Sequence, residues 1–511
     1  MKKTFDVVIV GSGIGGLASA VILAKEGRKV CVLEKNKQYG GNLQTFSRDK
    51  TVFDTGVHYI GGLDKNQNLN QYFSYLGIMD QLNLVKMDEN GYDLISFGEG
   101  EIQYPHAQGY ENFVQQLLLH FPKEEKALRT YCDKIQEICN SFPMYNLEEG
   151  KIYDDRIVSV KLTDFLNEIT DDEALKSVLI GSNFLYVADK DKTPLYVHAL
   201  TVNSYIQSAW RCINGGSQIS KLLIKELKKY GGEVYKNSEV VAFALDGKKI
   251  VSCTTQQGKV FYAEQFISNM NLKQTIRMVG KEHFSKPFVN RIMSLEEVTS
   301  AFSLYIIFKK DSFPYHNNNL YHYNSMEEVW DTNGKCDENW PNLLVSSFNT
   351  KEENQQWADS MTVMTYMDFS EVEPWAETVN VSTIKKLETR SESYEDFKQE
   401  KAAIILKKLE KLYPGILESI HSYHTSSPLT YRDFIGSEKG NMYGFVKDAN
   451  SPMKTFISPR SKIGNLFFSG QNVRMHGVMG VTIGAFVTCM EMVNKESLIR
   501  KMKKIKDEVI H

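Results

Sequence analysis

Two short apolar runs near the start of the chain bracket a glycine-rich turn and an amphipathic stretch. Residues 6–10 and 30–33 are rich in β-branched side chains, as is typical of strands buried on both faces of a parallel sheet. Between them, an apolar stripe with helical spacing runs from Leu17 to Ala24 and stops at Gly27. The pattern therefore predicts a strand, a helix and a second, parallel strand.

Farther along the chain, the spacing of apolar residues predicts a helical stretch, then a set of strands, then another helix. Residues 107–200 carry helical spacing with few turn signals, which predicts a mostly helical insertion. Residues 299–309, 342–348 and 361–369 are rich in β-branched and aromatic side chains, which predicts a sheet. Residues 393–413 have the spacing of an amphipathic helix. A sheet floor with a helical lid suits a long apolar substrate that must be removed from water.

The turn after the first run has the glycine spacing of a dinucleotide site, and its residues are Gly11, Ser12, Gly13, Ile14, Gly15 and Gly16. Gly11 allows the tight turn, Gly13 lets the backbone approach a pyrophosphate, and Gly16 lets the helix pack closely on the strand. The N-terminus of the helix then faces the anion. A bare turn of this kind can be purely structural, but the flanking strand, helix and strand favour the dinucleotide.

Glu34 ends the second apolar run, where it is placed to accept hydrogen bonds from ribose hydroxyls. Its negative charge would repel a 2′-phosphate. The sequence therefore predicts an adenine dinucleotide that lacks this phosphate.

The stretch from Glu34 through Lys35 to Gly40, Gly41 and Asn42 resembles the extended fingerprint of the flavin amine oxidase and phytoene desaturase superfamily. In that family the second glycine pair crosses the pyrophosphate and ribityl region, and NAD dehydrogenases lack it. The resemblance therefore implies that the dinucleotide is FAD.

Two later segments are similar to further FAD-binding parts of the family. Within residues 215–269, the resemblance implies that the backbone of Val240 lies against the adenine. Near the C-terminus, Gly470 and Gln471 match the strand end that meets the ribityl and pyrophosphate groups. A helix is expected after residues 476–480, a stretch that includes Val478, and the resemblance implies that its dipole would stabilise the negative charge of reduced flavin.

Residues 53–62 look like the segment that passes beside the flavin ring in carotenoid isomerases and retinol saturases. The alternative is a hairpin turn with an aromatic side chain in the core. The candidates for catalytic side chains near the ring are His58, Tyr59, Arg474 and His476, each of which could instead be a packing residue. No metal site is expected.

Three cofactor segments separated by two long insertions imply a discontinuous architecture. The expected fold class is α/β, with a Rossmann-type FAD-binding domain interleaved with an α+β substrate domain. The FAD-binding domain is expected to comprise residues 1–106, 201–285 and 461–494. The remaining parts are a helical insertion at 107–200, a sheet-plus-helix substrate domain at 286–460 and a basic tail at 495–511.

The resemblance implies an FAD-dependent oxidoreductase that acts on carbon–carbon double bonds of a lipophilic polyene or isoprenoid, as retinol saturases and carotenoid isomerases do. The alternatives are an amine oxidase or porphyrinogen oxidase-like flavoenzyme, a phytoene-type desaturase, or a flavin-binding protein without turnover. NAD(P)H is a candidate reductant. Because the sequence has no second glycine fingerprint, a nicotinamide would have to enter the substrate cavity.

Charge and cysteine content limit which classes of partner and which cellular compartment are expected. With 60 basic and 63 acidic residues the net charge is −3, so the chain offers no cationic surface for nucleic acid. The seven cysteines form no CxxC pair, which disfavours a zinc site or a disulfide framework and indicates a reducing compartment.

The termini bear on localisation. Asp6 and several glycines interrupt the first apolar run, so it is not a signal sequence and a cytoplasmic protein is expected. In the basic tail, Leu498, Met502 and Ile505 share one side. The tail is either a solvated terminal helix or a peripheral contact with an anionic membrane surface. The oligomeric state is left open.

Overall fold

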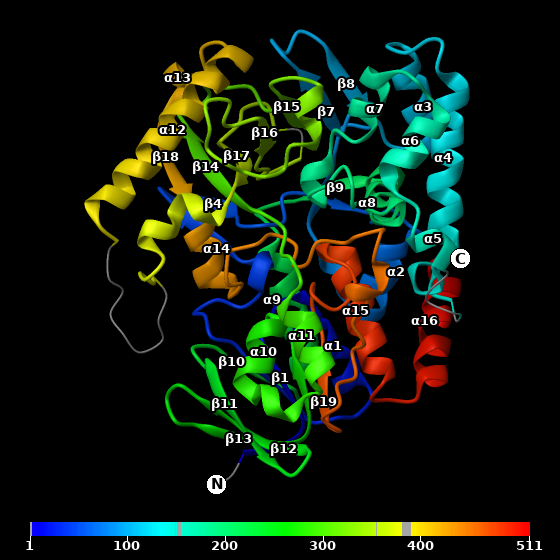
Figure 1. The fold of residues 1–511 in the computed structure, drawn as a ribbon, viewed down its shortest axis with the longest axis vertical. Helices are drawn as coiled ribbons and strands as arrows, with labels where there is room; N and C mark the ends of the chain where they lie inside the picture. The colour runs from blue at the N-terminus through cyan, green and yellow to red at the C-terminus, as the bar shows by residue number, and fades with distance from the viewer. Residues whose placement is uncertain (1–2, 149, 151–154, 354, 381–389, 511) are drawn as a thin grey trace.

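Two seven-stranded sheets organise the chain, one in the lower half and one in the upper half of Figure 1. The computed structural model describes residues 3–148, 150, 155–353, 355–380 and 390–510. The two sheets draw their strands from distant parts of the sequence, which is the interleaving that the segment pattern predicts.

The lower sheet has the strand order β10-β2-β1-β13-β12-β11, and β19 pairs with β13. Strands β10, β2, β1, β13 and β19 are parallel, and β11 and β12 form an antiparallel extension. The bounds are β1 Lys3–Val10, β2 Val30–Leu33, β10 Glu233–Tyr235, β11 Val240–Asp246, β12 Lys249–Thr255, β13 Val260–Ser268 and β19 Leu466–Phe468.

Strand β1 is apolar at successive positions because both of its faces are buried. Val7 and Ile9 belong to one buried cluster, whereas Val8 and Val10 belong to another on the opposite face. Helices cover the first face, namely α1 Ile14–Lys25, α2 Asn68–Leu76, α9 Ser217–Lys229 and α15 Gly477–Met490. Helices α10 Leu272–Val279 and α11 Lys286–Met293 cover the second. The predicted strand–helix–strand unit and the α/β fold class are confirmed.

The upper sheet has the order β18-β14-β17-β16-β15-β7-β8 and is antiparallel except between β15 and β7. Its bounds are β7 Asp93–Phe97, β8 Gln103–His106, β14 Ser300–Phe308, β15 Asn319–Tyr323, β16 Leu343–Phe348, β17 Ser360–Met367 and β18 Ile420–Ser426. The three predicted strands are confirmed as β14, β16 and β17. Strands β7 and β8 come from the segment 1–106 expected in the FAD-binding domain; the domain boundaries stay a prediction.

Smaller elements connect the sheets. Hairpin β3 Thr45–Arg48 and β4 Thr51–Asp54 precedes a three-stranded sheet of β5 Ile60–Gly61, β9 Ala209–Cys212 and β6 Leu84–Lys86. Phe53, on β4, is fully buried. The aromatic core contact that is the alternative for residues 53–62 is therefore present.

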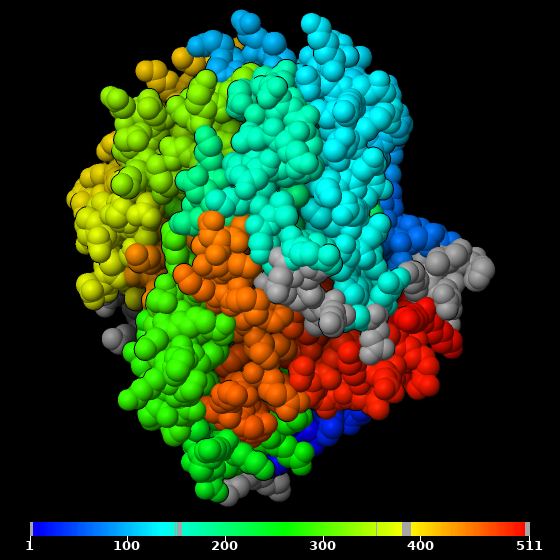
Figure 2. Space-filling model, turned by 45° about the vertical axis from the view of Figure 1, so that its right-hand side comes forward, coloured from blue at the N-terminus to red at the C-terminus, as the bar shows by residue number. Residues whose placement is uncertain are grey.

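The insertion at 107–200 is helical, as predicted. Its helices are α3 Tyr110–Leu118, α4 Glu125–Asn140, α5 Asp155–Val158, α6 Leu162–Ile169, α7 Glu173–Leu179 and α8 Leu195–Gln207, and they pack against the upper sheet. The predicted amphipathic helix is α12 Glu392–Leu412, and α13 Ile416–Ser419 and α14 Pro428–Ile435 follow it. In Figure 2 the orange C-terminal segment lies on the surface between the green elements below and the cyan helices above.

The basic tail forms helix α16 Lys495–Ile510. Leu498 and Met502 are almost fully buried in the same core as α2, and Ile505 packs against it. The apolar side predicted from the sequence therefore contacts the protein itself. Within the described parts of the chain, every helix is too short or too polar to cross a bilayer.

Candidate functional site: a dinucleotide cradle that opens into an apolar cavity

The glycine turn lies between the end of β1 and the start of α1. Gly11 has a φ of +98° and donates its N–H to the carbonyl of Leu33 at 2.8 Å, which ties the turn to β2. A Cβ at Gly16 would lie 2.1 Å from the carbonyl oxygen of Gly11, so only glycine lets the helix begin this close to the strand. The roles assigned to these two glycines from the sequence fit the observed geometry.

The second glycine pair passes directly over the first turn. Gly40 and Gly41 have φ values of +120° and +58°. A Cβ at Gly41 would lie 3.1 Å from the Cα of Gly13, so the two loops are in van der Waals contact. Gly40 also donates its N–H to the Oγ of Ser12 at 3.0 Å. Glycines stand at the closest approach of the two loops, which leaves backbone groups there to face a ligand.

Glu34 joins these loops. Its Oε2 accepts hydrogen bonds from the backbone N–H and the Oγ of Ser12, at 3.0 and 2.5 Å, and its Oε1 accepts from the N–H of Asn36 at 2.8 Å. Glu34 is 4% exposed and lines the cavity. It is therefore held in place beside the glycine turn, where the sequence expects a ribose.

Replacing Glu34 with Ala should weaken FAD binding by about 1.5–3 kcal/mol, because a charged acceptor for the ribose is lost. Fluorescence titration of the apoprotein with FAD measures this, and Glu34→Gln, which keeps one acceptor oxygen, should lose less. Equal affinity for FAD in all three proteins would show that the carboxylate only fastens the turn.

The end of the cradle where the resemblance implies the adenine is covered from two sides. Val240, at the start of β11, is 4% exposed and lines the cavity. Lys35 donates from Nζ to the carbonyl of Asp433 at 2.8 Å, and Asn36 donates to the carbonyl of Phe434 at 3.0 Å, so both hold helix α14 over the nucleotide site. Burial lowers the pKa of Lys35. Lys35 thus lines the site predicted for it while its ammonium group is bonded to the protein.

Asn269 is a candidate ligand that the sequence prediction did not include among the cofactor residues. It follows β13, and its Oδ1 would lie 2.6 Å from a Cβ at Gly15 and 2.9 Å from a Cβ at Gly470. This oxygen is buried and has no hydrogen-bond partner among the described residues. Its position at the end of a strand could have identified it as a cofactor residue, because β13 is parallel to β1 and ends at the same edge of the sheet.

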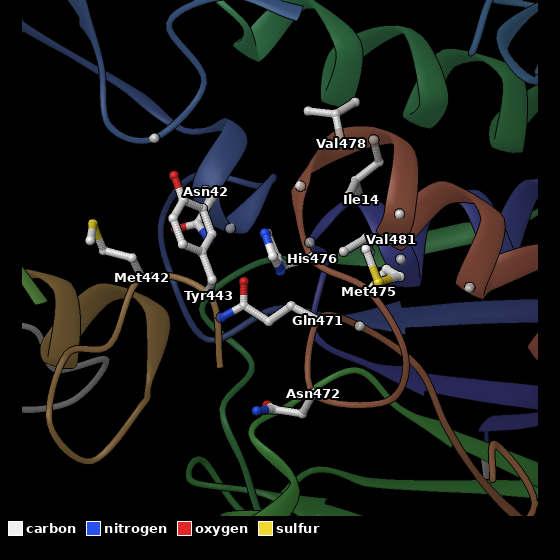
Figure 3. Close-up of a pocket in the computed structure, with 18 of the residues that line it drawn as sticks. Ile14, Asn42, Met442, Tyr443, Gln471, Asn472, Met475, His476, Val478 and Val481 are labelled. Carbon is white, nitrogen blue, oxygen red and sulfur yellow. The ribbon is translucent and has the colours of Figure 1, made fainter. Parts of the chain in front are cut away.

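The C-terminal residues of the predicted set lie on the same cavity. Gly470, with a φ of +96°, follows β19, and Gln471 and Val478 line the wall. Figure 3 shows Val478 and Ile14 on one side of the view and Gln471 below them, together with Asn42 from the second glycine loop. The structure thus brings the predicted cofactor residues to one place, and their contacts with a cofactor stay predictions.

Two of the four catalytic candidates, His58 and Tyr59, are neighbours in sequence but have different surroundings. His58 lines the cavity, and its buried Nδ1 has no partner among the described residues. Burial, and secondarily the charge of Arg211, lowers the pKa of His58 to about 4, so the ring is neutral at neutral pH. The hydroxyl of Tyr59 bonds to the Oδ2 of Asp93 and to the hydroxyl of Tyr321, both at 2.7 Å.

His476 and Arg474 lie on the loop before α15. The ring centroid of His476 is 4.7 Å from that of Tyr443, and its Nε2 is 3.2 Å from the carbonyl oxygen of Leu185. Figure 3 shows His476 and Tyr443 next to each other. Burial lowers the pKa of His476 to about 4. The guanidinium of Arg474 lies 4.9 Å from the ring of Phe456, and its Nε has no partner among the described residues.

Lys447 is a second cation on this wall that sequence reasoning missed. Burial and the charge of Arg474 lower its pKa to about 8. The residue lies in an irregular segment between α14 and β19, where no motif marks it. Together, the two cations place positive charge beside the cavity.

The cavity that these residues line has a volume of about 480 Å³. One end is the glycine cradle. The other end is formed by apolar side chains of the helical insertion and the upper sheet, among them Phe142, Met144, Phe184, Leu200, Val345 and Met364. Such a volume is typical of a small-molecule site. The glycine backbone of the cradle, the fixed acid Glu34 and the unpartnered amide oxygen of Asn269 fit the pyrophosphate and the hydroxyl groups of FAD.

The fold and the cavity are those of a dinucleotide-binding protein with a Rossmann-type sheet. A family model described as an NAD(P)-binding Rossmann-like domain matches residues 9–76. The structure of cyclohexylamine oxidase from Brevibacterium oxydans is similar over 99% of this chain and 100% of its own, with a TM-score of 0.60 and 15% identity. This similarity shows that the chain has the fold of cyclohexylamine oxidase along its length.

Two groups of curated relatives are similar to this chain along most of their length. The chain is 27% identical to the all-trans-retinol 13,14-reductase of Danio rerio, over 98% of this chain and 87% of that protein. It is 24% identical to the chloroplastic prolycopene isomerase of Arabidopsis thaliana, over 87% of this chain and 74% of that protein. The resemblance noted in the sequence to retinol saturases and carotenoid isomerases is confirmed.

Proposed function

We propose that the protein is an FAD-dependent oxidoreductase that acts on carbon–carbon double bonds of a lipophilic polyene or isoprenoid. The observation that supports this best is one continuous cavity with a nucleotide cradle at one end and apolar walls at the other. When bound, FAD supplies the two-electron redox chemistry on the double bond. The retinol reductase and prolycopene isomerase relatives support a polyene as the substrate.

Different residues of the chain would bind different parts of such a cofactor. The backbone of the glycine turn and the N-terminus of α1 would bind the pyrophosphate, Glu34 the ribose and Val240 the adenine. The N-terminus of α15 adds a positive dipole that stabilises negative charge on a reduced ring. The apolar residues at the far end would hold the polyene and exclude water from the reacting carbons.

The charges of the cavity argue against an amine substrate, although the fold is shared with amine oxidases. Among the described lining residues the carboxylates are Glu34 and Glu239, and both belong to the nucleotide end. Lys447 and Arg474 instead contribute positive charge. An alkylammonium ion would be repelled there, whereas a neutral polyene would not.

The test is an anaerobic assay of reduced enzyme with a panel of polyenes that includes retinol and carotenoids. A product that gains two hydrogens shows saturation, and unchanged mass with altered retention shows isomerisation. We also propose NAD(P)H as the reductant, so the flavin should bleach on its addition under these conditions. If reduced enzyme leaves every polyene unchanged and oxidised enzyme dehydrogenates one, the protein is a desaturase instead.

A peripheral membrane contact is a further proposal, because a lipophilic substrate must be drawn from a membrane. Since the apolar side of α16 is buried, the contact would be electrostatic and would use its exposed basic residues, Arg500, Lys501, Lys503 and Lys504.

A further inference from the structure

Two tyrosines lie on the wall of the cavity with their hydroxyls in contact. Tyr59 comes from the loop before β5, and Tyr321 comes from the centre of β15. Their hydroxyl oxygens are 2.7 Å apart, and that of Tyr59 is also 2.7 Å from the Oδ2 of Asp93. Asp93 itself is fully buried and does not line the cavity. The three groups therefore form a hydrogen-bonded chain from a buried acid to the cavity.

The acid at the inner end has no cation bonded to it among the described residues. Its Oδ1 accepts a hydrogen bond from Asn319 at 2.7 Å. The buried guanidinium of Arg211 bonds instead to Asn319 Oδ1, to Ser347 Oγ and to two backbone carbonyls. Asn319 thus stands between the arginine and Asp93. This arrangement holds the carboxyl in place without the direct ion pair that would keep it ionised.

The proton affinity of Asp93 suits a group that gives and regains a proton near neutral pH. Burial raises its pKa to about 7, and the bonds from Asn319 and Tyr59 and the charge of Arg211 oppose that rise. The other titratable groups that face it are Tyr92, Tyr205, Tyr321 and, opposite it on β8, His106. Burial lowers the pKa of His106 to about 4, so that ring is neutral.

We propose that Asp93, Tyr59 and Tyr321 form a proton relay, in which Tyr321 is the catalytic residue that protonates a carbon of the substrate. The proposal rests on the proposed function. Tyr59 and Asp93 act through Tyr321 as positioning residues. When Asp93 is protonated it donates to Tyr59, Tyr59 donates to Tyr321, and the hydroxyl of Tyr321 is left to donate into the cavity.

Saturation of one double bond consumes one hydride and one proton. The π bond of the polyene breaks, and one carbon gains a hydride from reduced FAD, which a nicotinamide or another two-electron donor has reduced beforehand. The π electron pair forms the second C–H bond with the proton of Tyr321. Tyr321 takes a proton from Tyr59, and Tyr59 takes one from Asp93, which is left ionised. Asp93 regains its proton along the same chain when the product leaves and water enters the cavity.

The first test compares variants in the anaerobic single-turnover reaction. In the wild type, the rate of flavin reoxidation by the polyene should fall as the pH rises through about 7, because Asp93 loses its proton. Tyr321→Phe should lower the rate at least about 100-fold, the usual contribution of a general acid. Tyr59→Phe and Asp93→Asn should lower it and remove the pH dependence. Normal FAD content and bleaching confirm that each variant is folded.

The matched control is Tyr92→Phe. This residue precedes Asp93 and is buried, and among the described residues its hydroxyl makes no hydrogen bond to the relay. It should keep the wild-type rate and pH profile. The proposal is overturned if Tyr321→Phe and Tyr59→Phe both keep them as well.

A second readout does not depend on activity. Infrared spectra of the wild-type holoenzyme should contain a carboxylic acid C=O band that titrates near pH 7, disappears in Asp93→Asn and shifts in Tyr59→Phe. Asp54→Asn is the control, because burial also raises the pKa of Asp54 to about 7 and its band should be a different one. If Asp93→Asn removes no such band, the relay is wrong. If the wild type neither reduces nor isomerises any polyene, the proposed function fails, and this titration alone decides whether the buried acid exchanges a proton.

Discussion

Gly13→Val is expected to abolish FAD binding while the chain still folds. Gly13 precedes α1 at the floor of the cradle, and a Cβ placed on it would lie 3.0 Å from the Nδ2 of Asn269. The loop at Gly41 also comes close, since a Cβ placed on Gly41 would lie 3.1 Å from the Cα of Gly13. The branched side chain would therefore occupy space beside the turn that the pyrophosphate needs. We expect affinity for FAD to fall at least about 100-fold, or roughly 2.7 kcal/mol.

The control for this change is Gly464→Val. Gly464 has no left-handed φ, and a Cβ there would have no atom within 4 Å, so the same substitution should leave FAD binding unchanged. Absorbance of the purified proteins and fluorescence titration with FAD measure both variants. A Gly13→Val protein that binds FAD as tightly as the wild type would show that the pyrophosphate does not cross this turn.

Phe486→Ala should destabilise the protein more than any of the site substitutions above. Phe486 lies on α15, is fully buried, and has its ring centroid 4.8 Å from that of Tyr72 and 5.2 Å from that of Tyr75 on α2. Removing a buried phenylalanine ring costs about 3–5 kcal/mol of the free energy of unfolding. Because α15 also packs against α1, the loss should loosen the cradle and weaken FAD binding.

Urea unfolding, followed by circular dichroism and by flavin release, measures this effect. Leu119→Ala is the control, because Leu119 is 76% exposed and its truncation should change stability by less than about 0.5 kcal/mol. Equal unfolding curves for Phe486→Ala and the wild type would contradict the view that helix α15 closes the core around the cradle.

The parts of the fold that could be predicted are those in which local sequence determines local structure. The glycine turn, strand β1 and helix α1 follow from steric limits and from a strand apolar on both faces. Helix α12 follows from its periodicity. The pairing of β7 with β15 could not be predicted, because it joins residues 226 positions apart, such as Asp93 and Asn319, and no local pattern encodes that contact.

In the candidate site, too, some residues could be predicted from local sequence and others could not. Tyr59 is a candidate from the sequence because its segment resembles one that passes beside the flavin. Its partners Asp93 and Tyr321 lie on strands of the upper sheet, so only the folded chain shows that the tyrosine connects a buried acid with the cavity. Lys447 was missed for a related reason, since its surroundings rather than its neighbours in sequence lower its pKa.

The most direct test of the central claim is one anaerobic turnover of the purified holoenzyme. FAD is first reduced, a polyene is then added without oxygen, and the flavin absorbance and the mass of the polyene are followed together. If the polyene is saturated, as the proton relay requires, the absorbance of oxidised flavin returns, with one double bond reduced for each flavin reoxidised. Isomerisation would change the retention of the polyene and leave its mass and the flavin unchanged. A flavin that stays reduced while every polyene remains intact would contradict the claim.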